Sequence, residues 1–288
     1  MSRNRQIMCN NRQPRSGLAG IGMVLFSLLL PLRLASGQDA TFNGKPTTID
    51  SRDGRGLAYV LDRLQGLYLT RVTYEEVPFE NPAELISATV VYNGISTAVL
   101  ANPVINFSVT LGPSDSSAYA AAQSVMVAYG SASMPGTYTV VQATGRVDVI
   151  PARVLGVSGA IRDVAPVMSR PVTFPVATRT VADTVQLIVD GLSASSGFRV
   201  VLLDAPHLEA VSLGAAGEAA RDVIGKMAST LGLPITFQCL YDAGDKTYYL
   251  NVKIVAPAPV AGGPALHGYI KPLPRVGPAN SPFFTKDK

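Results

Sequence analysis

The chain has 288 residues, of which 47% are hydrophobic and 15% are charged. This length accommodates about two domains, and the composition is too apolar for a disordered chain and too polar for a protein with several membrane spans. The net charge of +4 comes from residues 1–37, which hold five arginines and no acid; without them, 24 basic against 20 acidic residues become 19 against 20. Because a nucleic-acid binder needs a clustered basic surface, we expect no nucleic-acid partner.

Residues 1–37 have the pattern of an export signal. Four arginines precede an apolar run from Gly17 to Leu32, and small residues follow at Ala35 and Gly37, where a signal peptidase would cut. The run is shorter than the roughly 20 residues that span a bilayer as a helix. We therefore predict a cleaved signal peptide and a periplasmic or secreted mature protein. The alternative is an uncleaved anchor, which would be the protein's contact with the membrane.

Residues 171–255 have the pattern of a small α/β domain. Thr180 and Asp183 are typical of a helix start, because the hydroxyl caps free amide groups and the acid is favoured in the first turn. Gly232 and Pro234 are typical of a helix end. The expected elements are a helix from Thr180 to the region before Gly197, strands over 198–203 and 211–213, a helix over 218–231, and a hairpin of strands 235–240 and 247–255.

Residues 38–154 follow a similar order with one addition. The dipeptide Asn93-Gly94 between two apolar runs is the strongest short hairpin signal, and it places an extra hairpin between a strand and the second helix. The expected elements are a helix around Leu57, Val60, Leu61 and Leu64, a strand over 69–77, a hairpin of strands 86–92 and 95–100, a strand over 104–111, a helix over 118–129, and a hairpin of strands 138–142 and 146–150.

These patterns predict an α+β fold made of two small α/β sandwich-like units, each running helix-strand-strand-helix-hairpin, with a hairpin insertion in the first. The expected organisation is a signal peptide over 1–37, a first domain over 38–154, a linker over 155–170, a second domain over 171–255, and a flexible tail rich in proline over 256–288.

The second unit resembles a known family of modules. The residues that carry the resemblance are Val181–Val189, Ser196–Val200, Val211–Leu213, Ala219–Ile224 and Leu231–Leu233. They resemble the short βαβ modules at the N-termini of outer-membrane secretins and TonB-dependent receptors, and also uncharacterised secreted bacterial proteins. In the first two families these modules contact other envelope proteins and contain no catalytic residues. The resemblance implies a partner among envelope proteins, while the inserted hairpin departs from the family pattern.

The sequence offers little support for catalysis or metal binding. The two histidines, His207 and His267, are far apart and no G-x-S-x-G motif accompanies them. Asp242 and Asp245 flank Gly244 without the alternating ligand spacing of a calcium loop, which favours a turn. We expect no catalytic residue, no metal and no cofactor. Cys239 would be the single thiol after export, and its apolar neighbours favour core packing.

An acidic and aromatic cluster is the candidate binding site. Rigid aromatic side chains often carry interface energy, and here they accompany the densest group of acids in the chain. The candidate binding residues are Tyr74, Glu75, Glu76, Phe79, Glu80 and Tyr92. The predicted function is an exported, non-enzymatic protein that binds another envelope protein, by strand addition at an open sheet edge. The alternative is a hydrolase of envelope polymers in which Glu75, Glu76 or Glu84 line an acidic cleft.

Overall fold

A computed structural model describes residues 46–51, 55–92, 95–132, 136–208 and 210–256. The predicted signal peptide, most of the predicted tail and the Asn93-Gly94 turn lie outside these ranges, so those calls stay predictions. Within the described ranges, no helix is both long and apolar enough to cross a membrane.

The described part of the chain is mixed α+β, as the sequence predicts. The helices are α1 (Gly56–Tyr68), α2 (Ala118–Ser131), α3 (Val181–Ser196) and α4 (Ala220–Leu231), with 3-10 turns η1 (Pro82–Glu84) and η2 (Val167–Ser169). The strands of the first half are β1 (Thr47–Asp50), β2 (Arg71–Glu75), β3 (Ile86–Tyr92), β4 (Ile95–Ala101), β5 (Ser108–Leu111), β6 (Thr137–Ala143) and β7 (Arg146–Leu155). The later strands are β8 (Ile161–Asp163), β9 (Pro171–Arg179), β10 (Arg199–Asp204), β11 (Val211–Ala219), β12 (Ile235–Asp242) and β13 (Thr247–Ile254).

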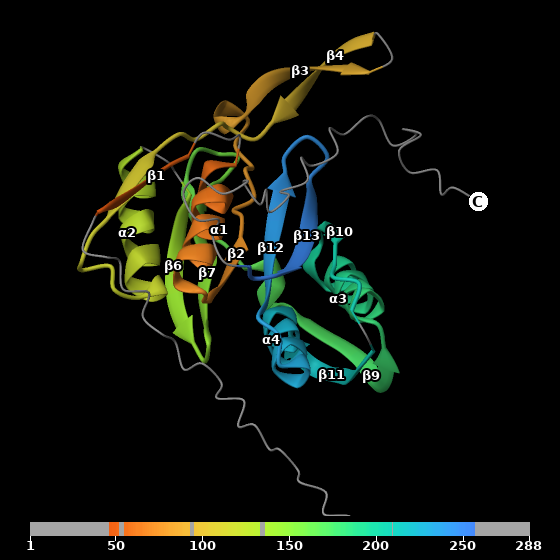
Figure 1. Cartoon of the computed structure of the whole chain (residues 1–288). Coiled ribbons are helices and arrows are strands. Elements are labelled where there is room, and N and C mark those ends of the chain that lie inside the picture. Colours follow the sequence, from red (N-terminus) through yellow and green to blue (C-terminus); the bar gives the residue numbers. More distant parts are fainter. Residues whose placement is uncertain (1–45, 52–54, 93–94, 133–135, 209, 257–288) are drawn as a thin grey trace, which may run out of the picture. The chain divides into compact units, whose positions relative to one another are not determined.

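One large sheet contains strands from both predicted units (Figure 1). Its order is β10-β13-β12-β2-β7-β6, and β8 also pairs with β7. The pairs β10–β13, β12–β2 and β2–β7 are parallel, whereas β12–β13 and β6–β7 are antiparallel hairpins. Three two-stranded sheets, β1–β5, β9–β11 and β3–β4, lie outside it. Since β12 pairs with β2, the arrangement as two separate units is not confirmed.

Two hydrophobic cores lie on opposite sides of β12. Phe237, Cys239 and Tyr241 belong to the core that holds the apolar faces of α3 and α4. Leu240 belongs to the core that holds those of α1 and α2. Alternate residues of a strand point to opposite faces of its sheet. The helices of the first and the second half therefore cover opposite faces of the large sheet.

Several element boundaries differ from the sequence-based expectation. The sequence-based expectation contains no strand over residues 171–179, where the structure has β9. This strand accommodates two prolines because Pro171 opens it and Pro175 lies at a register shift against β11. Helix α4 begins at Ala220, not at Glu218, because β11 continues to Ala219 against β9. The strand expected over 104–111 is shorter, and it pairs with β1. The predicted linker contains β8 and η2.

Candidate interaction site

Tyr74, Glu75 and Glu76 of the predicted cluster lie at the seam where β2 and β12 run side by side. In this parallel pair Tyr74 lies opposite Gln238 and Glu75 lies opposite Cys239. The backbone amide of Glu76 then donates to the carbonyl oxygen of Cys239 at 2.8 Å. The chain order alone does not reveal this pairing, since about 160 residues separate the two strands. These three residues therefore lie between the two halves of the large sheet.

Glu75 is a buried carboxylate with three donors around it. Its side chain accepts the backbone N–H groups of Val167 and Met168, the second at 3.1 Å, and a guanidinium N–H of Arg221 at 3.1 Å. The residue is 1% exposed. Burial raises its pKa to about 7, against the lowering effect of Arg221 and of the two amides. Glu75 thereby ties β2 to η2 and to α4.

Glu76 makes a second tie across the same seam. Its carboxylate accepts from Arg55 and from the backbone amide of Tyr241 at 2.9 Å. Arg55 also donates to the carbonyl oxygen of Tyr241 at 2.9 Å, and the hydroxyl of Tyr248 donates to the carbonyl oxygen of Glu76 at 3.2 Å. Burial raises the pKa of Glu76, and Arg55 opposes this shift. Both acids therefore act as internal anchors between the halves.

The other predicted binding residues occupy different environments. Tyr74 is buried against Tyr138, with ring centroids 5.7 Å apart, and Phe79 is buried in the core of the second half. Glu80 is half-buried and forms an ion pair with Arg162. Tyr92 is the last residue of β3, at the turn end of the inserted hairpin, and its side chain is outside the described set. A side chain must be exposed to contact a partner directly. Among the candidate residues from Tyr74 to Glu80, Glu80 is the one that is not buried.

The inserted hairpin, β3–β4, is an exposed feature outside the large sheet. Among the described strands, β3 and β4 pair only with each other, and Figure 1 shows the hairpin standing away from the large sheet. The segment from Ile86 to Ala101 contains no charged residue. Ile86 is 40% and Leu100 51% exposed. Natural proteins protect edge strands with charges, prolines or covering segments, and the described part of this hairpin has none of these.

Asn102 anchors the foot of the hairpin to the second half. Its side-chain amide donates to the carbonyl oxygen of Tyr241 at 2.6 Å and accepts from the backbone amide of Ala243 at 2.9 Å. Gly244 lies so close that a Cβ there would be 2.7 Å from the carbonyl oxygen of Leu100. Sequence reasoning missed Asn102, because a single asparagine after a strand carries no signal of a partner so distant in sequence. The hairpin and the seam are therefore physically connected.

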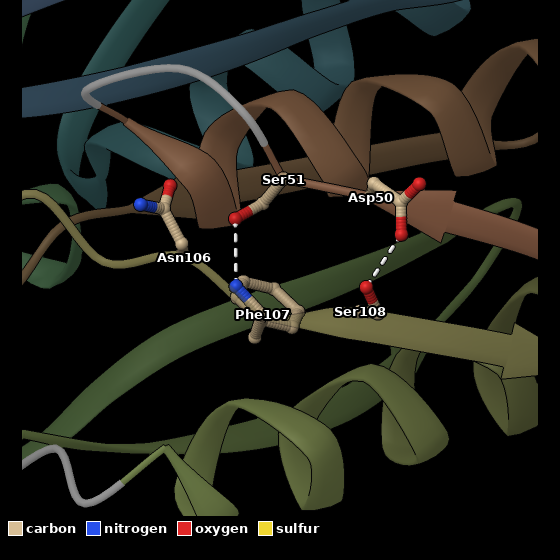
Figure 2. A pocket seen from close by; sticks show the side chains of 5 residues that line it. All are labelled: Asp50, Ser51, Asn106, Phe107 and Ser108. Carbon is tan, nitrogen blue, oxygen red and sulfur yellow. Dashed lines mark hydrogen bonds between the residues drawn. The ribbon is translucent and has the colours of Figure 1, made fainter.

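A hollow lies where Asp50 of β1 pairs with Ser108 of β5, and none of the candidate binding residues lines it. It is lined by Asp50, Ser51, Asn106, Phe107 and Ser108 (Figure 2). The Ser51 hydroxyl donates to the carbonyl oxygen of Ile105 and accepts from the amide of Phe107, both at 3.0 Å. The Ser108 hydroxyl donates to Asp50 at 2.5 Å. These bonds hold β1 against β5, so the lining serves the fold.

The cysteine and the histidine among the described residues do not form a common site. Cys239 is free and fully buried, as its sequence context predicts, and burial raises the pKa of its thiol. His207 is exposed in the segment between β10 and β11. The described residues contain no group of three or more histidines, cysteines or acids that could hold a metal ion.

No protein-family model, curated protein sequence or solved structure matches the chain. The functional assignment therefore rests on the chain's own geometry: a buried seam of carboxylates, and an uncharged hairpin whose foot is fixed to that seam.

Proposed function

We propose that the protein is an exported, non-enzymatic envelope or secreted protein whose two α/β modules present the β3–β4 hairpin to another protein. The partner contributes an extended segment that adds to the edge of β3 or β4. The proposal rests chiefly on one observation: an uncharged hairpin that pairs only with itself among the described strands, on a base fixed by Asn102.

Physical chemistry favours a partner for such a hairpin. An isolated two-stranded hairpin is marginally stable in water. Its outer edges carry backbone N–H and C=O groups that an added strand can pair, while alternate side chains supply specificity. The described side chains of Ser87, Thr89, Ser96 and Thr97 are exposed, so a partner strand would meet hydroxyl and apolar groups and no charge. The resemblance to modules that contact envelope proteins points the same way.

The test is in-cell crosslinking of the tagged protein, affinity purification and identification of partners by mass spectrometry. We expect a reproducible envelope-protein partner that is lost when Leu100→Lys places a charge on the hairpin. Val127→Lys is the matched control, because Val127 is also apolar and is 72% exposed, on α2 and outside the hairpin. A partner retained by Leu100→Lys would contradict the role of the hairpin. Enrichment on cell-wall or polysaccharide material without a protein partner would overturn the interaction function.

The observations that support the hydrolase alternative are the pKa values of its candidate acids: burial raises the pKa of Glu75 to about 7 and also raises those of Glu76 and Glu84. A general acid or base must also reach its substrate. Glu75 is 1% and Glu76 7% exposed, and their carboxylates already accept from Arg221 and Arg55. The same purified protein tests this alternative: release of soluble fragments from envelope polymers that stops in Glu75→Gln would favour it.

A further inference from the structure

The two halves of the large sheet repeat the same arrangement of three strands, apart from register shifts in β10–β13 and β6–β7. Arg71 and Val72 begin β2 as Arg199 and Val200 begin β10. In the first half, the amide of Val72 donates to the side chain of Gln65, at the end of α1; in the second half, the amide of Val200 donates to the side chain of Ser193, at the end of α3. Strand β2 is therefore the counterpart of β10.

The hairpins at the other side of each half also correspond. Strand β7 lies parallel to β2 and antiparallel to β6, just as β13 lies parallel to β10 and antiparallel to β12. In the first half, Val149 lies opposite Tyr74 on one side and Val140 on the other. In the second half, Leu250 lies in the same way between Leu202 and Cys239. Strand β6 is therefore the counterpart of β12.

This correspondence relates the strands joined at the seam to the strands at the two ends of the large sheet. Within the chain, β12 joins β2 in parallel. Their counterparts, β6 and β10, are the two ends of the large sheet, and no described strand covers their outer sides. Each chain thus exposes at its ends the same two kinds of edge that it joins at its centre.

Side chains that close the seam have counterparts on the exposed edges. Thr236 and Lys253 lie opposite one another across the β12–β13 hairpin; the Thr236 hydroxyl donates to the carbonyl oxygen of Val72 at 2.9 Å, and Lys253 pairs with Asp62 of α1. Thr137 of β6 takes the place of Thr236. Arg153 lies opposite Thr137 after a one-residue register shift in β6–β7 that β12–β13 lacks, and this shift brings Arg153 to the place of Lys253. Val200 and Asp190 of α3 take the places of Val72 and Asp62. Threonine is kept, and the two charges keep their signs.

Residues on the exposed edges are less buried than their counterparts at the seam, as expected for edges that no described strand of the same chain covers. Leu240 of β12 is fully buried under the helices of the first half, whereas its counterpart Val141 of β6 is 40% exposed. The side chain of Arg153 is 63% exposed, and it forms an ion pair at 3.4 Å with Asp163, which is itself exposed. Asp190 is exposed on α3. The β6 and β10 ends of the sheet therefore have residue types similar to those of the seam, but these residues are exposed.

We propose that copies of this chain associate head to tail, with β6 of one copy adding in parallel to β10 of the next and repeating the seam between β12 and β2. The register of the seam places Thr139 of one copy opposite Leu202 of the next. Arg153 then pairs with Asp190, and Val141 is buried under α3. Such a contact uses two different surfaces, so it builds open filaments or closed rings.

This association is tested by sedimentation velocity on the exported protein. Concentrations from about 1 µM to about 1 mM cover weak dissociation constants. We expect larger species to grow with concentration. Arg153→Glu would face Asp190, and Asp190→Arg would face Arg153; each variant should weaken association by about tenfold or more. The double variant restores opposite charges and should restore association. Lys226→Glu, an exposed reversal on α4, is the control.

The outcomes are distinguishable provided that each variant keeps the wild-type circular dichroism and unfolding midpoint. Association that is weakened in both single variants and returns in the double variant supports the proposal. A protein that stays monomeric at about 1 mM overturns it, as does association that survives both reversals. Association that is lost in Leu100→Lys but survives both reversals would assign self-association to the β3–β4 hairpin and also overturn it.

Discussion

Replacing Glu75 by glutamine tests whether burial governs the charge at the seam. The carboxyl group has an ordinary pKa of 4.5 and a pKa of about 7 in the fold. The folded protein therefore binds this proton more tightly than the unfolded chain does. The stability that comes from the proton is fully present below pH 4.5 and is lost as pH rises through 7, and the difference amounts to about 3 kcal/mol.

A competing effect acts on the same carboxylate. Arg221 and the amides of Val167 and Met168 all stabilise the ionised form, and three such donors can lower a carboxyl pKa well below its ordinary value. If they outweigh burial, the sign reverses: Glu75 then adds stability at neutral pH and loses it in acid. Glutamine cannot ionise, so it removes the titration while keeping the shape.

The assay is urea unfolding of the wild type and of Glu75→Gln between about pH 4 and pH 8.5. The free energy of unfolding of the wild type minus that of the variant should fall by about 3 kcal/mol as pH rises from 4.5 to 8. Glu80→Gln is the matched control, since it makes the same chemical change a few residues away, in a half-buried ion pair with Arg162. A difference that stays constant, or that grows with pH, would refute the reasoning that burial dominates.

Three further changes test the local structure. Leu69 ends α1 in the left-handed region at φ 49° and is 62% exposed. Leu69→Gly should therefore raise the free energy of unfolding by up to about 1 kcal/mol, and Gly197→Ala at the corresponding end of α3 should lower it by about as much. Urea unfolding measures both changes. Asn102→Ala removes two hydrogen bonds at the hairpin foot and should speed amide exchange in β4; unchanged exchange would contradict the anchoring role of Asn102. The Cys239 thiol should resist a maleimide at pH 8 in the folded protein and react in urea; rapid labelling of folded protein would contradict its burial.

The sequence predicts the elements of this fold wherever local chemistry decides them. The Thr180 hydroxyl accepts from the amide of Asp183 at 3.1 Å, as a capping residue should, and Gly197 ends the helix with φ 77°. The inserted hairpin has the strands that flank the Asn-Gly dipeptide. In each case the deciding contacts lie within a few residues of one another.

The sequence does not predict the seam, because its deciding contacts are distant along the chain. Glu75 and Glu76 follow a short strand and precede a proline, which is also the pattern of a solvated acidic loop. Their donors include Arg221 and Tyr241, far along the chain. Without those partners in view, two adjacent acids indicate an exposed site. With them, the same acids are the internal ties of the sheet.

The difference between the β2 and β10 edges explains why one is joined within the chain and the other is left open. Counted along the strand, Leu203 of β10 takes the position of Glu75 of β2, and it lies in the register shift that brings Asp204 opposite Asn251. A buried carboxylate needs donors in fixed places, and only the chain's own η2 and α4 supply them, so Glu75 specifies which strand and which register β2 accepts. Leu203 imposes no such requirement. Strand addition at β10 therefore depends on backbone pairing, apolar burial and one ion pair, and these favour a contact that forms and dissociates with concentration.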